Sequence, residues 1–271
     1  MLYNKPYFLG EDKDWLVFVH GAGGSSNLFF KQIRAFQDHF NLLLIDLRGH
    51  GKSREVTFTE IIKGEYTFEK VSKDILEVLD HHKIEKAHFM GISLGTIIVR
   101  TIGELWPERV ESLIMGGAIA RLNFRSKFLV GVGNAIKRFV PYMWLYKLVA
   151  WIIMPKKRHS LSRNLFIREA KKLCQKEFLR WFNLTKDLNK LLKYFYEKDL
   201  KLPSLYIMGA DDYMFLPQVK ELVKGQTGAM LNVIDKCGHV CNIEAPDTFN
   251  HLSLDFLLER RHKLRLQIKN G

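Results

Sequence analysis

Cysteine is scarce in this 271-residue sequence, which has three cysteines and no C-x-x-C pair. An odd number at irregular spacing argues against a disulfide scaffold or a cysteine-based zinc module and fits a reducing compartment. Residues 1–8 lack a basic run followed by a long apolar stretch, so we expect no signal peptide and a cytoplasmic protein. A hydrophobic fraction of 47% with only seven prolines excludes a disordered or fibrous chain and allows a sizeable core.

Acidic residues are few in the middle of the chain. The whole sequence has 42 Lys and Arg against 29 Asp and Glu, a net charge of +13. Residues 121–200 contain 19 of these basic residues and five acidic ones, so the rest of the chain is nearly neutral. The same residues contain 14 of the 33 aromatic side chains. We therefore expect an insertion at 121–200 within a host formed by 1–120 and 201–271.

Short apolar runs bounded by glycine or polar residues recur along the host and predict strands buried on both faces. These runs are residues 15–19, 42–45, 87–90, 113–115, 205–208 and 231–234. Apolar spacing predicts a helix over 68–79 with Thr67 as its N-cap, and a second from Leu94 to about Trp106. The alternation indicates an α/β fold with a doubly wound, mostly parallel sheet, which binds ligands at the carboxyl ends of its strands. The insertion shows no strand pattern and predicts a helical cap over those ends.

A serine lies at the end of one predicted strand, in Gly91-Ile92-Ser93-Leu94-Gly95. G-x-S-x-G between a strand and a helix is the pattern of a nucleophile elbow, because the serine needs a strained turn and small neighbours. A serine hydroxyl becomes a good nucleophile when a base takes its proton and an acid orients that base. His239 and the pair Asp211-Asp212 each follow another predicted strand. The order Ser, Asp, His at strand ends predicts a triad with either aspartate as the acid.

With these residues in view, the chain resembles the α/β-hydrolase superfamily, in its cap-bearing group of small esterases and lipases. The likeness covers most of 15–120 and 203–258 and is much weaker across the insertion. It is carried by His20-Gly21-Ala22-Gly23-Gly24, Asp46-Leu47-Arg48-Gly49-His50-Gly51-Lys52-Ser53, the elbow at Ser93, the turn at Asp212 and Gly238-His239.

This resemblance implies roles for single residues. In similar proteins the acid comes three residues after the glycine that ends its strand, here Gly209, which selects Asp212. The resemblance also implies an oxyanion hole formed by the backbone N–H groups of Ala22 and Leu94. Fixed amides at a helix N-terminus stabilise developing negative charge without reorganising.

The implied function is that of a serine hydrolase with Ser93, Asp212 and His239 as its catalytic residues. It would cleave a carboxylic ester or thioester with an apolar acyl group through an acyl-enzyme. Two alternatives with the same residues remain open: a lyase of the menaquinone-pathway type, and a signalling protein of the same fold. Serine at position 93 argues against the dehalogenases and epoxide hydrolases of the superfamily, whose nucleophile is aspartate.

We expect no cofactor, no metal ion and no nucleic acid as a partner. Gly51-Lys52-Ser53 ends like a phosphate-binding loop, but Asp46 stands where that loop needs glycine. No G-x-G-x-x-G follows a predicted strand. His81-His82 lacks a set of ligand partners and fits a solvated helix end, and no nucleic-acid-binding module accompanies the basic charge.

Residues 139–155 are apolar apart from Lys147 and are flanked by basic residues. The lysine makes them a poor membrane span. Three interpretations stay open: a lid over an apolar pocket, an amphipathic surface that contacts lipid, and a solvated basic face. We expect the aromatic side chains of the insertion to face Ser93. Its Lys and Arg side chains would reach outward and attract anionic lipid or an anionic acyl carrier.

Overall fold

A computed structural model of the chain describes residues 1–54 and 66–270, with 263–270 described by their backbone alone. Within these ranges, no helix has both the length and the apolar composition that crossing a membrane requires.

The described residues form a seven-stranded sheet at the centre of the molecule, in the order β1-β3-β2-β4-β5-β6-β7. The strands are β1 (Asn4–Tyr7), β2 (Trp15–Val19), β3 (Asn41–Ile45), β4 (Ala87–Ile92), β5 (Val110–Gly116), β6 (Ser204–Gly209) and β7 (Ala229–Ile234). Only β1 pairs in the antiparallel sense, with β3, and the other strand pairs of the sheet are parallel. The predicted mostly parallel α/β sheet is therefore confirmed.

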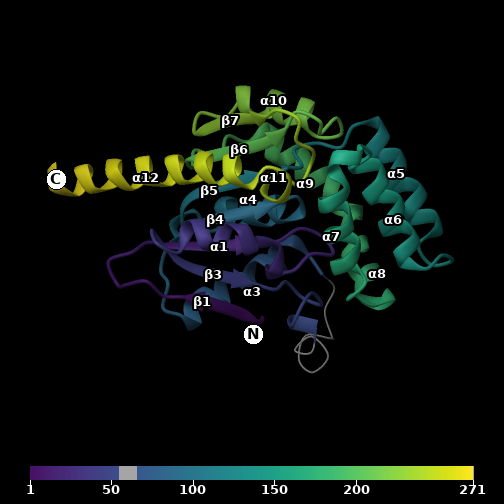
Figure 1. Cartoon of the computed structure of the whole chain (residues 1–271), viewed down its shortest axis with the longest axis horizontal. Helices are drawn as coiled ribbons and strands as arrows, with labels where there is room; N and C mark the ends of the chain where they lie inside the picture. The colour runs from purple at the N-terminus through teal and green to yellow at the C-terminus, as the bar shows by residue number, and fades with distance from the viewer. Residues whose placement is uncertain (55–65, 271) are drawn as a thin grey trace.

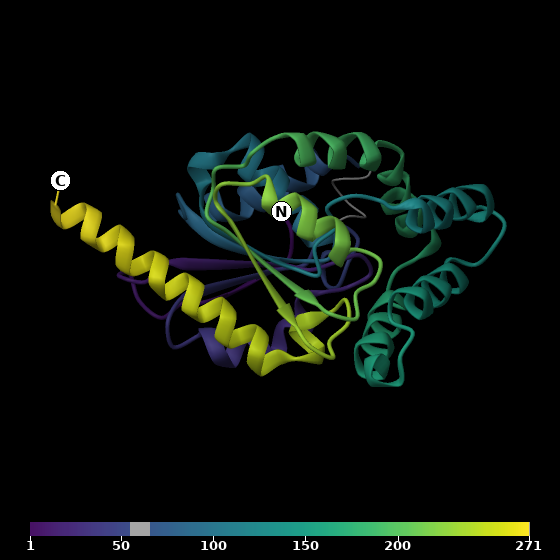
Figure 2. The same cartoon turned by 90° about the horizontal axis from the view of Figure 1, so that it is seen from above.

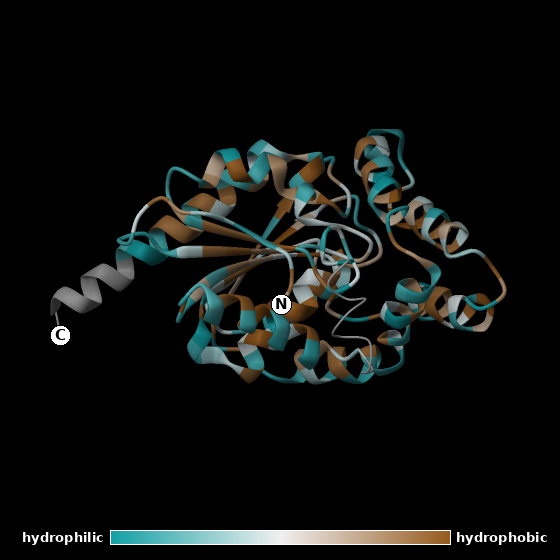
Figure 3. Ribbon diagram, turned by 90° about the horizontal axis from the view of Figure 1, so that it is seen from below, coloured by the Kyte–Doolittle hydropathy of each residue, from teal (hydrophilic) through white to brown (hydrophobic). Residues whose placement is uncertain are grey.

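Helices cover both faces of the sheet, which explains why the central strands are apolar throughout. The covering helices are α1 (Phe30–Phe36), α3 (Phe68–His81), α4 (Leu94–Leu105), α10 (Leu216–Lys224), α11 (Cys241–Glu244) and α12 (Pro246–Asn270). Val17 and Val19 of β2 pack with α3 and α4, whereas Leu16 and Phe18 pack with α1 and α12. Successive side chains of a strand point to opposite faces, so each face has its own core. Figure 3 shows the hydrophobic strands between these helices.

Local signals in the sequence position several helix ends. The hydroxyl of Thr67 accepts a hydrogen bond from the Lys70 amide at 3.1 Å, as expected of an N-cap. Helix α4 ends at Leu105, two residues before Pro107. Short 3₁₀ turns connect other elements; they are η1 (Ser26–Phe29), η2 (Pro107–Arg109) and η3 (Lys157–His159).

Five helices lie between β5 and β6, in the part of the chain whose composition differs from the rest. They are α5 (Phe124–Ile136), α6 (Tyr142–Ile153), α7 (Ser160–Ala170), α8 (Gln175–Asn183) and α9 (Thr185–Glu197). Figures 1 and 2 show α5 to α8 at one end of the molecule and the C-terminal part of α12 projecting from the opposite end. Side chains of α8 and α9 join the main core, whereas α6, α7 and the start of α8 share a smaller cluster of their own.

Candidate active site

Ser93 occupies a strained turn between β4 and α4. Its backbone has φ +55° and ψ −118°, a region that costs a residue other than glycine about 1–3 kcal/mol. Glycine flanks the turn because the backbones nearly touch there. A Cβ on Gly91 would lie 2.6 Å from the carbonyl oxygen of Gly95, and a Cβ on Gly95 would overlap that of Val19. The turn leaves the Ser93 side chain partly exposed at the carboxyl end of the sheet.

The three predicted triad side chains lie together. The Nε2 atom of His239 is 2.9 Å from Ser93 Oγ, and its Nδ1 atom is 2.7 Å from Asp212 Oδ2. Asp212 is 1% exposed and also accepts a hydrogen bond from the Phe215 amide at 3.2 Å. The carboxylate is therefore held in a fixed position beside the imidazole. The arrangement suits proton transfer from the serine hydroxyl to Nε2.

Asp211 points away from this group of side chains. Its carboxylate accepts hydrogen bonds from Lys156 Nζ at 2.5 Å and from Arg158 Nε at 2.6 Å. Burial alone would raise the pKa of Asp211, but the hydrogen bonds from Lys156 and Arg158 outweigh it and lower this pKa. Asp211 thus connects the inserted helices to the loop that carries Asp212.

The loop that carries Ala22 runs beside the serine. A Cβ built on Gly21 would lie 3.1 Å from Ser93 Cβ and 3.7 Å from the Leu94 nitrogen. Ala22, Leu94 and Ser93 line the same cavity. The Leu94 amide is at the N-terminus of α4, where backbone N–H groups carry partial positive charge. Ala22 and Leu94 therefore both border the cavity that contains Ser93.

Two buried histidines, His20 and His50, hold this loop, and the sequence analysis gave neither a role. Nε2 of His50 accepts a hydrogen bond from the Gly23 amide at 3.0 Å, and Nε2 of His20 accepts one from the Leu47 amide at 3.0 Å. Burial lowers the pKa of His20, and it lowers that of His50 to about 3. Both rings are therefore neutral near pH 7, which leaves Nε2 free to accept. His20 and His50 lie in the two sequence motifs that carry the family resemblance, residues 20–24 and 46–53. Their place in these motifs is the sequence feature that points to a role.

Three carboxylates, of which Glu169 and Glu177 are buried and Glu244 is partly exposed, connect the inserted helices to the loops around the site. Glu169 of α7 accepts from the Ser25 hydroxyl at 2.7 Å, and Glu177 of α8 accepts from the Tyr66 hydroxyl at 2.7 Å. Here the carboxylate belongs to the host: Glu244 of α11 accepts from the Ser162 hydroxyl of α7 at 2.7 Å and from the Gly238 amide at 2.6 Å. These long-range contacts were not predictable from local sequence patterns.

A cavity of about 270 Å³ extends from Ser93 and His239 into the inserted helices. Among the described residues that line it, none is Lys, Arg, Asp or Glu. The aromatic side chains in its walls are Tyr146, Phe166, Phe178, Trp181, Phe182 and Phe215. The cavity therefore suits a neutral, apolar group next to the serine.

The expectation that the aromatic side chains of the insertion face Ser93 is wrong for several of them, which point to solvent instead of into the cavity. The exceptions are Phe124, Phe128, Phe139, Trp144 and Trp151, which are 55% to 86% exposed. Residue counts show that aromatics are abundant but do not show which side of a helix carries them. Helices α5 and α6 are apolar on both the cavity side and the outer side.

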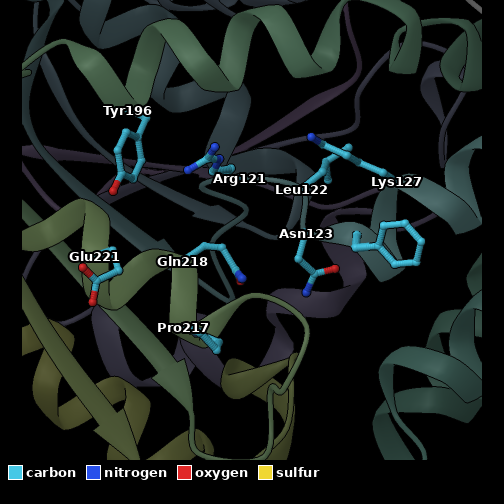
Figure 4. Close-up of a pocket in the computed structure, with 9 residues that line it drawn as sticks. Arg121, Leu122, Asn123, Lys127, Tyr196, Pro217, Gln218 and Glu221 are labelled. Atoms are coloured by element: carbon cyan, nitrogen blue, oxygen red, sulfur yellow. The ribbon is translucent and has the colours of Figure 1, made fainter.

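A second cavity, of about 410 Å³, lies away from the triad. Figure 4 shows Arg121, Tyr196, Gln218 and Glu221 around it, and the guanidinium of Arg121 lies 5.5 Å from the centre of the Tyr196 ring. None of the three triad residues lines it. This cavity is therefore not the candidate active site.

Comparison with known proteins finds relatives along most of the chain. A family model described as the alpha/beta hydrolase fold matches residues 14–246. Among curated relatives, a 2-hydroxy-6-oxononadienedioate/2-hydroxy-6-oxononatrienedioate hydrolase of Pseudomonas putida is 29% identical over 266 residues. The match covers 92% of this chain and 89% of the relative.

Solved structures match along nearly the whole chain. The enol-lactonase of Burkholderia xenovorans LB400 aligns with a TM-score of 0.77 at 23% identity, covering 95% of this chain and 96% of that one. MenH from S. aureus aligns with a TM-score of 0.81 at 17% identity, covering 96% and 100%. At these identities the structural matches establish the shared fold alone.

Proposed function

The chain belongs to the alpha/beta hydrolase fold family, whose curated relatives here are hydrolases, and on this premise we propose that it is a serine hydrolase. Its substrate is a carboxylic ester or thioester with a neutral, apolar acyl group. The observation that carries the proposal is the hydrogen-bonded series from Ser93 Oγ through the imidazole of His239 to Asp212.

In the first half of the reaction, His239 Nε2 takes the proton of Ser93 as Oγ attacks the substrate carbonyl carbon. The carbonyl oxygen gains negative charge, and the Ala22 and Leu94 amides stabilise it. When the bond to the leaving group breaks, the imidazolium gives its proton to the departing oxygen or sulfur. An acyl group bound to Ser93 remains.

In the second half, a water molecule takes the place of the leaving group. Nε2 accepts a proton from the water, the hydroxide oxygen attacks the acyl carbon, and the proton passes to Ser93 Oγ as the acid product leaves. Asp212 keeps the Nδ1 proton in place and stabilises the imidazolium in both halves. His20 and His50 keep the loop with the Ala22 amide in position by accepting from neighbouring backbone N–H groups.

The cavity supports the preference for a neutral acyl group. The P. putida relative is named for a dicarboxylate substrate. A carboxylate buried without a cationic partner loses its hydration with little compensation, and no Lys or Arg is among the described residues that line this cavity. We therefore propose that this chain acts on a different class of substrate from that relative.

We also propose that the protein is cytoplasmic, as its cysteine content led us to expect. All three cysteines are free thiols, and two of them, Cys237 and Cys241, are buried.

Hydrolysis of p-nitrophenyl esters of increasing acyl length tests the proposed activity. The wild-type protein should hydrolyse them with a preference for apolar chains longer than acetate, and Ser93→Ala should lose about 10³-fold or more of the rate. The matched control is Ser72→Ala, which removes a buried hydroxyl in α3 and should keep the activity. The lyase and signalling alternatives predict no turnover of any simple ester.

A further inference from the structure

Helices α5 and α6 present large apolar side chains to solvent. On α5 these are Phe128 (67% exposed) and Val132, and on α6 they are Trp144 (72% exposed), Leu148 and Trp151. Positions three and four residues apart lie on one side of a helix, so each set forms a continuous stripe. We call these five residues, with Phe139 in the connecting loop, the outer face.

The outer face differs from the surface of an ordinary water-soluble helix. Such a helix keeps one apolar side for the core and a polar side for water, whereas α6 has Lys147 as its one charged residue. Large exposed apolar patches mark surfaces that bind a protein, a ligand or a membrane. The surrounding exposed side chains include Arg125, Lys127 and Lys147, so the patch is apolar with a basic border.

The outer face reaches the cavity that contains Ser93. Val132 and Leu148 are 36% and 46% exposed and also line that cavity. An acyl chain that lies against the outer face is therefore next to side chains that also form the wall of the cavity.

We propose that the outer face docks on the surface of an anionic lipid bilayer and that the substrate enters the cavity from the bilayer. This proposal rests on the proposed ester hydrolysis for the identity of the substrate, but the docking itself does not depend on it. Trp and Phe side chains insert at the boundary between headgroups and acyl chains, and Lys and Arg bind anionic headgroups.

Charge favours a bilayer over the other occupants of such a face. Residues 121–200 carry 19 basic and five acidic side chains, so two copies meeting through this face would repel each other. The length of α6 favours docking along the bilayer surface rather than insertion across it, because its 12 residues extend only about 18 Å. A helix of that length lies along the membrane surface, with its apolar side in the lipid and Lys147 beside the headgroups.

Vesicle sedimentation of the full-length protein tests the docking. All proteins carry Ser93→Ala, so that no substrate is consumed and binding is measured apart from activity. The lipid is phosphatidylcholine alone or with about 30% phosphatidylglycerol. The test variant adds Phe128→Ser, Phe139→Ser and Trp144→Ser, none of which lines the Ser93 cavity. The matched control adds Phe8→Ser, because Phe8 is 64% exposed but lies beyond β1 in the host.

We expect binding to the anionic vesicles and weaker binding to the neutral ones. The triple variant should lower the partition coefficient at least about tenfold, whereas the Phe8 variant should bind like its parent. Binding should weaken as salt rises from about 50 to about 500 mM, since screening shortens electrostatic attraction. Equal binding by the triple variant, or an equal loss with Phe8→Ser, would overturn the proposal. So would binding to neither kind of vesicle together with concentration-dependent dimerisation through this face.

Activity assays distinguish the proposed bilayer docking from the proposed ester hydrolysis. With Ser93 intact, the triple variant should hydrolyse a short, dissolved p-nitrophenyl ester at the wild-type rate and lose activity on the same ester presented with a long acyl chain in anionic vesicles. Failure of the wild type on every ester would refute the hydrolase and leave the sedimentation result valid. Equal loss on both substrates would contradict a role in docking.

Discussion

Asp211 and Asp212 are neighbours in the chain, yet their carboxylates serve different parts of the molecule. Asp212 is hydrogen-bonded to His239 at 2.7 Å, whereas Asp211 is bonded to Lys156 and Arg158 of the inserted segment. The loop after β6 therefore orients the imidazole and fastens the insertion beside it. Substitution of each aspartate separates the two effects.

Asp212→Asn should lower kcat by about 10³- to 10⁴-fold, because an amide does not stabilise the imidazolium and favours the wrong tautomer. Asp211→Asn should change kcat by less than about tenfold and act mainly on KM, since it loosens the insertion that forms the cavity walls. Steady-state kinetics on one ester measure both values. A larger loss of kcat with Asp211→Asn than with Asp212→Asn would reverse the assignment of the acid.

Activity should fall at acidic pH, because a histidine acts as a general base only while its ring nitrogen is unprotonated. His239 accepts the Ser93 proton at Nε2 only while that nitrogen is unprotonated, so the acidic limb should follow one ionisation. The dependence of kcat/KM on pH measures it. A rate that stays constant down to about pH 4 would contradict a histidine base.

Stability should also fall at acidic pH, through the buried histidines outside the triad. Burial lowers the pKa of His50 to about 3 and that of His88 to about 4. An unfolded histidine protonates near pH 6.5, so between that pH and about pH 4 the unfolded chain binds more protons. The free energy of unfolding should drop by about 1.4 kcal/mol per pH unit for each such histidine.

Urea denaturation at pH 7 and pH 5 measures this drop, and His88→Gln isolates one contribution. His88 lies in β4 and bonds the Ser112 hydroxyl at 2.8 Å. The variant should be less stable at pH 7 but should lose less stability on acidification than the wild type. An identical loss in both proteins would show that His88 is not held neutral in the folded state.

The neutral cavity predicts discrimination against charged acyl groups. An ester of hexanoate should be cleaved at least about 10²-fold faster, in kcat/KM, than the half-ester of adipate, because the second carboxylate finds no cationic partner in the cavity. The rates of alkaline hydrolysis of the two esters give the control for intrinsic reactivity. Equal kcat/KM values would mean that a charged group reaches solvent from the cavity.

Local sequence patterns predicted the elements that surround the site. The strands from β2 to β6 contain apolar runs because most of their residues are buried, and Ser93 was recognisable from the glycines around it. The expected burial on both faces is wrong for β7, because this strand lies at the edge of the sheet and leaves Met230 and Val233 47% and 39% exposed. The sequence did not predict β1, a short edge strand that contains Pro6, or α12, whose apolar spacing we did not recognise as a helix.

Features that depend on contacts between residues far apart in the chain could not be predicted from local sequence patterns. The hydrogen bonds of Glu177 with Tyr66 and of Glu169 with Ser25 join residues more than 100 positions apart. The side of a helix on which Trp144 lies depends on how that helix packs, and its composition alone suggested the opposite side. The basic charge of the insertion was evident early, but its association with an exposed aromatic face required the structure.

Covalent trapping of the nucleophile tests the central claim most directly. The protein is incubated with a fluorophosphonate, which reacts with activated serines, and the adduct is located by peptide mass spectrometry. We predict one adduct, on Ser93, in the wild type and in Ser72→Ala. We predict none in Ser93→Ala, and slow labelling in Asp212→Asn. Labelling of another residue, or equal labelling of the Ser93→Ala protein, would contradict the assignment of Ser93 as the nucleophile.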